Sequence, residues 1–198
     1  MRKCLAVLAL CAALCVATLN AQPVKARGFA NAPIMMEVYS DYQCPYCKEL
    51  YEKTLTPLMA EYVDKGKVYL IHRELPNPSL HPHAVEAACY ASAANHVGKY
   101  EQAAEILFRD QEQWANSGKV DETVCRILTP EEAKKVRALA RDPSILAEVQ
   151  RDVDAARAAH IETTPTVFLT FRLKQYPIPG AVSYNVLRRF IDQLLSSN

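Results

Sequence analysis

The amino-acid sequence predicts an α/β domain that is interrupted by an all-helical insertion. Strand-like apolar runs lie near both ends of the chain, whereas the segment between Pro82 and Ile161 shows only helical patterns. The composition is that of a globular protein, since half of the 198 residues are hydrophobic, 23% are charged and the net charge is +1. This composition disfavours a disordered chain and a basic protein that binds nucleic acid.

Residues 1–21 have the pattern of a secretory signal peptide. The basic residues Arg2 and Lys3 precede an apolar run to Leu19, which ends in small and polar residues. The run is short for a membrane-spanning helix, which needs roughly 20 residues, and a retained anchor is the alternative. We expect cleavage after Ala21, with Ala17 as the second choice, and export of the remaining chain.

The chain has seven cysteines, and three of them belong to the predicted signal peptide. The four that remain are Cys44, Cys47, Cys89 and Cys125. In an oxidising compartment, an even number of cysteines indicates disulfides.

Residues 22–80 predict a strand, a helix and a second strand. The first strand is Ile34–Tyr39, and a helical pattern starts at Cys44. The second strand, Val68–Ile71, is apolar on both faces, as in a buried parallel strand. This order requires a crossover and therefore indicates a βαβ unit. Pro57 predicts a kink in the helix, or a new helix that is capped by Thr56.

Residues 81–160 form the predicted helical insertion. An alanine-rich helix covers His83–Asn95, and an amphipathic pattern follows from Tyr100 to Gln111. Thr129 starts a capping box with proline at the first helical position, and Pro143 begins a long helix that reaches about His160.

Residues 161–198 complete the α/β domain. A strand is predicted for Thr166–Phe171, and a turn at Pro179-Gly180 leads into a last amphipathic helix. The residues of this helix that we expect to face inward are Val186, Leu187, Phe190, Ile191 and Leu194.

The segment Cys44-Pro45-Tyr46-Cys47 carries the predicted chemistry. Two cysteines three positions apart at a helix start can close a small disulfide ring, and the helix N-terminus lowers the pKa of the first thiol. That thiolate attacks substrates, and the second cysteine resolves the mixed disulfide. The alternatives are a structural disulfide or half of a zinc site. A zinc site needs about four ligands, and no second closely spaced cysteine pair exists, so we expect neither a metal nor a cofactor.

The sequence resembles the thioredoxin superfamily, in particular the DsbA-like thiol–disulfide oxidoreductases of the bacterial cell envelope. The resemblance covers about Ile34 to Leu195. The matching segments are Ser40 to Cys47, the alanine-rich helix after His81-Pro82-His83, Gly98-Lys99-Tyr100 leading to Leu107-Phe108, and Thr164-Pro165-Thr166. The resemblance implies a thioredoxin fold with an all-helical insertion between a βαβ half and a C-terminal ββα half. It also implies a periplasmic or cell-envelope location.

The resemblance implies roles for individual residues. Cys44 would be the exposed nucleophile and Cys47 the resolving thiol. Pro165 would be in cis and face the disulfide, and Thr164 would offer backbone groups to an extended substrate. From the residues alone, Pro165 is an ordinary proline at a strand edge. Pro45 and Tyr46 are the remaining candidates for the substrate surface.

Two departures from the family pattern lead to further expectations. Many relatives have a buried glutamate six residues before the first cysteine, where this chain has Val38. Glu37 is displaced by one residue, which turns it to the opposite face of the strand unless a bulge restores it. We expect deprotonation of Cys47 to rely on water. The link from Phe171 to Pro179 lacks an Asn-Gly turn, which predicts a longer hairpin.

The remaining candidates have less specific signals. Cys89 and Cys125 are either a structural disulfide, which we favour, or two separate buried thiols. His81 and His83 are expected at cap or rim positions. Trp114 fits either the core or the border of the substrate groove.

The favoured function is an exported oxidase that donates the Cys44–Cys47 disulfide to reduced, unfolded secreted proteins through a mixed disulfide at Cys44. The resemblance implies reoxidation by a quinone-linked membrane partner of the DsbB or VKOR type. The resemblance also implies an alternative, because Thr164 before the proline is similar to the pattern of disulfide isomerases, which favours a reductase or isomerase. A different class of function is a non-catalytic dithiol protein that binds a metal or apocytochrome. The chain has no room for a dimerisation domain before the first strand, so we expect a monomer.

Overall fold

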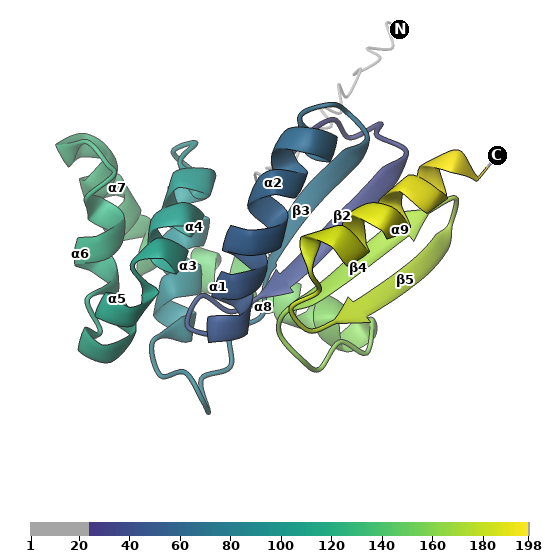
Figure 1. Ribbon diagram of the computed structural model, residues 1–198. Coiled ribbons are helices and arrows are strands. Elements are labelled where there is room, and N and C mark those ends of the chain that lie inside the picture. The colour runs from purple at the N-terminus through teal and green to yellow at the C-terminus, as the bar shows by residue number, and fades with distance from the viewer. Residues whose placement is uncertain (1–23, 198) are drawn as a thin grey trace, which may run out of the picture.

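The computed structural model describes residues 24–197, and the predicted signal peptide lies outside this part of the chain. A five-stranded sheet in the order β1-β3-β2-β4-β5 forms its centre (Figure 1). The strands are β1 (Ala26–Arg27), β2 (Ile34–Ser40), β3 (Val68–Glu74), β4 (Thr166–Phe171) and β5 (Lys174–Pro179). Strands β2 and β3 are parallel, and the other neighbouring pairs are antiparallel. This is the predicted thioredoxin arrangement, with β1 as an additional strand.

The helix after β2 changes its winding instead of breaking at Pro57. It comprises α1 (Pro45–Leu50), the π-helical stretch η1 (Tyr51–Leu55), α2 (Thr56–Leu58) and a second π-helical stretch, η2 (Met59–Val63). Thr56 has helical backbone angles, and its hydroxyl donates to the carbonyl oxygen of Tyr51 at 2.9 Å. The predicted cap at Thr56 is therefore wrong, because wider turns accommodate a proline that lacks an N–H group.

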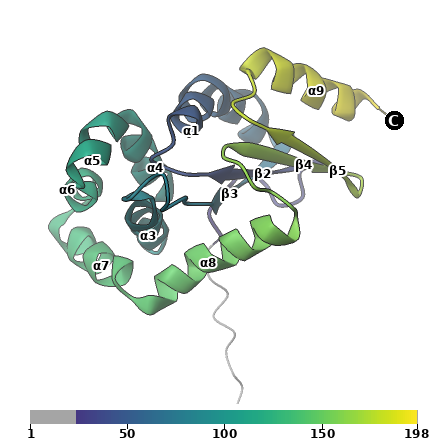
Figure 2. The same ribbon diagram turned by 90° about the horizontal axis from the view of Figure 1, so that it is seen from below.

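Six helices lie between β3 and β4. They are α3 (Ala84–Asn95), α4 (Tyr100–Arg109), α5 (Gln111–Ser117), α6 (Val120–Cys125), α7 (Pro130–Ala140) and α8 (Pro143–Ala158). Helices α3–α7 gather on the β3 side of the sheet, whereas α8 runs under one face of it (Figure 2). The predicted capping box is present, since the side chain of Thr129 accepts from the N–H of Glu132 and the carboxylate of Glu132 accepts from the N–H of Thr129. No helix in the described residues is both long and apolar enough to span a membrane.

The opposite face of the sheet is covered by the α1–η2 helix and by α9 (Tyr184–Ser196), which lie above the sheet in Figure 2. Leu187, Ile191 and Leu194 of α9 are buried, as predicted. Phe190 is half-buried, and Val186 is 49% exposed, so the prediction of an inward Val186 is wrong. The apolar face of α9 is thus narrower than the sequence pattern suggested.

The hairpin between β4 and β5 is tight, so the expectation of a longer hairpin is also wrong. Phe171 pairs with Lys174, which leaves only Arg172 and Leu173 in the turn. Both turn residues have positive φ angles, 47° and 66°. These are the left-handed conformations of a two-residue type I′ turn, which Asn-Gly sequences adopt most easily.

Candidate active site

The CxxC segment lies where β2 passes into α1. Cys44 has an extended backbone and occupies the N-cap, and Pro45 takes the first helical position, where its missing N–H leaves no bond unmade. The N–H groups of Cys47 and Lys48 donate to the Cys44 carbonyl oxygen at 3.1 and 3.2 Å. This geometry holds the Cys44 side chain at the N-terminal end of a helix, where the backbone favours an anion.

The two cysteines differ in their access to solvent. Cys47 is completely buried and packs in the main core, and the N–H of Asp41 donates to its sulfur at 3.4 Å. Cys44 is only 5% exposed, so the expectation of an exposed nucleophile needs correction. Cys44 nevertheless lines a surface groove, whereas Cys47 does not, so Cys44 is the one of the pair that a substrate can reach.

The pKa values of the two thiols move in opposite directions. The pKa of Cys44 falls to about 6, chiefly through a hydrogen bond from the Cys47 thiol, with further stabilisation from the N–H groups of Cys47 and Tyr46. Burial and then the neighbouring Cys44 sulfur raise the pKa of Cys47 well above its ordinary value. At neutral pH the reduced pair is therefore a Cys44 thiolate beside a Cys47 thiol.

The predicted cis proline faces this pair. The Thr164–Pro165 peptide bond is cis, and the carbonyl oxygen of Thr164 lies 3.8 Å from the Cys44 sulfur. The carbonyl oxygen of Pro165 accepts from the N–H of Gly180 at 2.8 Å, which ties this loop to the end of β5. The two short motifs that carried the sequence resemblance therefore meet at one place.

A groove with a volume of about 680 Å³ opens beside Cys44. Two segments form its other walls, the loop that follows β3 and the residues that lead into the cis proline. Tyr46 and Leu80 are apolar and largely exposed, at 63% and 72%. The lining residues are Cys44, Pro45, Tyr46, Leu75, Pro76, Asn77, Pro78, Leu80, His81, Ile161, Glu162, Thr163 and Thr164. The predicted substrate-surface residues Pro45, Tyr46 and Thr164 thus share one groove with Cys44.

Sequence reasoning missed Asp41, which organises the active-site loops. Its carboxylate is 1% exposed and accepts hydrogen bonds from the N–H groups of Gln43 and Asn77 at 2.7 and 2.8 Å. The same carboxylate lies 2.8 Å from Nδ1 of His81. An acidic residue between an apolar strand and the CxxC segment was the available signal, but its partners lie 36 and 40 positions away.

The helical insertion also contributes to the site. The side-chain amide of Gln111 is buried and donates to the carbonyl oxygens of Tyr42 and Cys44 at 2.6 and 3.0 Å. Trp114 belongs to the core, since it is fully buried and its Nε1 donates to the Leu107 carbonyl oxygen at 2.7 Å. The insertion thus braces the loop before α1 through Gln111 and not through the tryptophan.

Glu37 lies on the sheet face that points away from the cysteines. Strand β2 pairs residue by residue with β3 and β4 without a bulge. The carboxylate of Glu37 instead binds the guanidinium of Arg73 at 2.7 Å. The expectation that the shifted glutamate does not reach Cys47 is therefore confirmed.

The disulfide expected between Cys89 and Cys125 is absent, because all four cysteines of the described residues are free thiols. Cys89 is buried in a small cluster with Ile145 and Val149 of α8. The thiol of Cys125, at the end of α6, donates to the carboxylate of Asp121 at 2.9 Å. Each sulfur has its own surroundings, which favours the alternative of two separate thiols.

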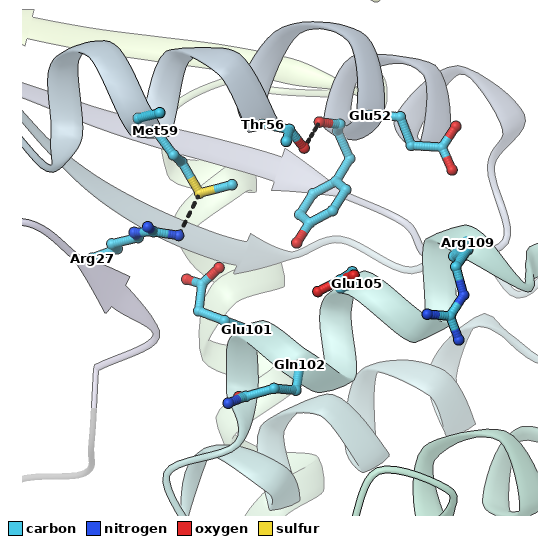
Figure 3. Close-up of a pocket in the computed structure, with 10 residues that line it drawn as sticks. Arg27, Glu52, Thr56, Met59, Glu101, Gln102, Glu105 and Arg109 are labelled. Carbon is cyan, nitrogen blue, oxygen red and sulfur yellow. Dashed lines mark hydrogen bonds between the residues drawn. The ribbon is translucent and has the colours of Figure 1, made fainter.

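A second pocket, of about 610 Å³, lies between the η1–η2 stretch and α4 (Figure 3). Charged side chains line it, among them Glu101, Glu105 and Arg109 of α4 and Glu52 of η1, and Arg27 contacts the Met59 sulfur at 3.6 Å. None of the cysteines lines this pocket. Within residues 24–197, no group of three or more His, Cys, Asp and Glu side chains could hold a metal ion. We therefore place the active site in the groove beside Cys44.

Comparisons with known sequences identify two kinds of relatives. Disulfide bond formation protein D of Bacillus subtilis is 22% identical over 187 residues, which are 90% of this chain and 79% of that protein. The Na(+)/H(+) antiporter NhaA 3 of Salinispora tropica is 28% identical over 151 residues, which are 76% of this chain. The chain spans only about a fifth of the length of such antiporters (22% for this one).

Solved structures share the fold. Wolbachia pipientis alpha-DsbA1 superimposes with a TM-score of 0.74 at 21% identity and covers 86% of this chain and 90% of its own. Oxidised BdbD from Bacillus subtilis gives a TM-score of 0.74 at 18% identity, covering 88% of this chain and 94% of its own.

The profile of a family described as Thioredoxin matches residues 21–193, which is most of the chain. This match includes the CxxC segment, the helical insertion and the cis proline. The chain therefore belongs to the thioredoxin family, and within it resembles the DsbA-like thiol–disulfide oxidoreductases.

Proposed function

We propose that the protein is an exported thiol–disulfide oxidoreductase that acts as a disulfide oxidase. It would donate the Cys44–Cys47 disulfide to reduced, unfolded secreted proteins. The observation that carries this proposal is the lowered pKa of Cys44, about 6, beside a fully buried Cys47. A stabilised Cys44 thiolate favours the reduced form of the pair, and a protein with a stable reduced form is an oxidant.

The reaction follows from the different access of the two sulfurs. A substrate thiolate attacks the Cys44 sulfur and forms a mixed disulfide, while Cys47 leaves and takes up a proton because its pKa is high. A second substrate thiol loses its proton and attacks the substrate sulfur of the mixed disulfide. Cys44 then leaves as a thiolate. The substrate gains a disulfide, and the protein is left with one thiol and one thiolate.

The groove beside Cys44 supports an extended polypeptide as the substrate. Its exposed apolar side chains, Tyr46 and Leu80, suit the apolar residues of an unfolded chain. The backbone of Thr164 lies next to the Cys44 sulfur, where it can pair with a substrate strand. Backbone pairing of this kind gives broad specificity, as an oxidase with many substrates requires.

The location and partners belong to the same proposal. Residues 1–21 favour export to the periplasm or cell envelope. A quinone-linked membrane reoxidase of the DsbB or VKOR type would regenerate the disulfide, and the protein would work as a monomer. Relatives named disulfide bond formation protein D support the oxidase role over the other functions.

One observation favours a second candidate, a reductase or isomerase. The residue before the cis proline is threonine, and the family resemblance links a threonine at this position to isomerases. A dithiol protein that binds without turnover remains the alternative of a different class.

The redox equilibrium of the purified protein with glutathione tests the proposal. A reduction potential of about −120 mV for the Cys44–Cys47 pair is expected for an oxidase, and one of about −270 mV would indicate a thioredoxin-like reductase. In parallel, the oxidised protein should introduce disulfides into a reduced, denatured secreted protein in stoichiometric amounts. A reduction potential of about −270 mV, together with failure to introduce disulfides in this assay, would overturn the proposal that the protein is an oxidase.

A further inference from the structure

His81 and Asp41 form a pair at the wall of the groove that the redox steps described so far do not use. Nδ1 of His81 lies 2.8 Å from Oδ2 of Asp41. The Asp41 carboxylate is fully enclosed, and the N–H groups of Gln43 and Asn77 fix both of its oxygens. A carboxylate held in this way requires a donor from the imidazole, so the Nδ1 atom carries the proton.

The second nitrogen of His81 has no such partner. The imidazole is 20% exposed and lines the same groove as Cys44 and Thr164. Nδ1 is occupied by Asp41, and within residues 24–197 no hydrogen bond reaches Nε2. With the proton on Nδ1, Nε2 of the neutral ring is an acceptor.

The proposed oxidation needs a proton acceptor in this groove. A substrate cysteine attacks as a thiolate, yet an ordinary cysteine has a pKa of about 8.5 and is mostly protonated at neutral pH. Cys44 cannot take this proton, since its sulfur is in the disulfide when the substrate arrives. The other titratable groups that line the groove are Cys44, Tyr46 and Glu162, and Asp41 lies against Nδ1 of the ring. Among the titratable groups that line the groove, only the imidazole of His81 is held in a fixed orientation by a buried carboxylate.

We propose that His81, oriented by Asp41, is the general base that accepts the proton of the incoming substrate thiol. The S–H bond breaks as the proton moves to Nε2, the S–S bond to Cys47 breaks as the substrate sulfur bonds to Cys44, and Cys47 leaves as a thiolate that takes up a proton from solvent. The imidazolium then gives its proton to solvent before the second thiol reacts. His81 is thus a catalytic residue and Asp41 a positioning residue, in an inference that rests on the proposed thiol oxidation.

Two thiol probes separate this role from a structural one. A peptide with two alkyl thiols must lose a proton before it attacks, whereas 5-thio-2-nitrobenzoate is already a thiolate at neutral pH. We expect His81→Asn and His81→Gln to slow reduction of the oxidised protein by the peptide about 10-fold or more, since general bases contribute typically 10²–10⁴-fold. The rate with 5-thio-2-nitrobenzoate should change less than about twofold. Free imidazole in the buffer should restore part of the lost rate.

His83→Asn is the matched control, because His83 lies two residues away and does not line the groove. It should leave both rates unchanged, and the glutathione equilibrium should be the same for all variants. Equal slowing with both probes would mean that His81 only shapes the site, and no slowing with the peptide would mean that it accepts no proton; either result overturns the inference. A further outcome is that the His81 variants react slowly with the peptide alone while the wild-type protein fails to oxidise an unfolded protein. In that case the oxidase proposal fails and the role of His81 stands.

Discussion

The Cys44 sulfur lies 3.8 Å from the carbonyl oxygen of Thr164, although the two residues are 120 positions apart in the chain. Thr164 precedes the cis proline and lines the groove together with Cys44. A substrate strand that pairs with this backbone is thereby held beside the one reactive sulfur. Substrate binding and disulfide exchange consequently occur at the same place.

Replacement of the buried cysteine should trap substrates. In Cys47→Ala, the mixed disulfide at Cys44 has no internal thiol to resolve it, so covalent complexes with reduced, unfolded proteins should accumulate. Cys44→Ala should trap none, because the Cys47 sulfur is fully enclosed. Non-reducing electrophoresis followed by mass spectrometry of the linked peptides measures both outcomes. Complexes through Cys47 in the Cys44→Ala variant would contradict the assignment of the nucleophile.

The stability of the reduced protein should depend on pH through Cys44. The pKa of its thiol is about 6 in the folded protein, compared with an ordinary value of about 8.5. Because the folded pKa is the lower one, ionisation favours folding; this contribution is complete above about pH 9 and is lost as the pH falls through about 6. The melting temperature of the reduced form, minus that of the oxidised form, should therefore increase from pH 5 to pH 8.

The oxidised form is the internal control for this measurement. Glu74 is a buried carboxyl whose pKa is raised to about 6, chiefly by burial, and none of the groups that shift it is a cysteine, so we expect it to titrate alike in both redox forms. Its contribution cancels in the difference. Cys47→Ala removes the main cause of the low Cys44 pKa and should move the midpoint of Cys44 alkylation towards the ordinary value. An unchanged midpoint would show that the helix N-terminus alone lowers this pKa.

The features that the sequence predicted correctly are those determined by local chemistry. The CxxC segment, the capping box at Thr129 and the strand Thr166–Phe171 each depend on neighbouring residues. The pair of Asp41 and His81 could not be predicted, since it depends on how the loop after β3 returns to the CxxC segment. The surroundings of Cys89 and Cys125 could not be predicted for a similar reason, because cysteine spacing carries no information about which way each thiol turns.

The turn between β4 and β5 could not be predicted from the sequence for a different reason. The two strands impose on Arg172 and Leu173 a conformation that these residues do not prefer. Leu173 has φ = 66° and is 97% exposed, so its side chain contributes no packing that could offset the strain. Leu173→Gly should raise the free energy of unfolding by about 0.5–1 kcal/mol, since glycine adopts this conformation freely but adds entropy to the unfolded chain.

Urea denaturation of the oxidised protein measures this effect. Leu146→Gly is a matched control, since Leu146 is also an exposed leucine, at 50%, but lies within α8. There the same substitution should lower stability by about 1 kcal/mol, because glycine disfavours a helix interior. If Leu173→Gly destabilises as much as the control does, the turn is not strained.

Lys25 links β3 to α8 through buried charges and should be essential for stability. Its ammonium group contacts Asp152 at 2.5 Å and Glu74 at 3.6 Å, and all three side chains are less than 10% exposed. Lys25→Met would leave these two carboxylates with one cation fewer in the interior, and loss of one partner of a buried pair costs about 3–5 kcal/mol. We expect the lower end of this range, because Arg73 still contacts Asp152 at 3.1 Å.

Asp64→Asn is the control, since it breaks the exposed Arg27–Asp64 pair and should cost less than about 1 kcal/mol. Equal losses for the two variants in urea denaturation would show that the buried network adds nothing beyond a surface ion pair.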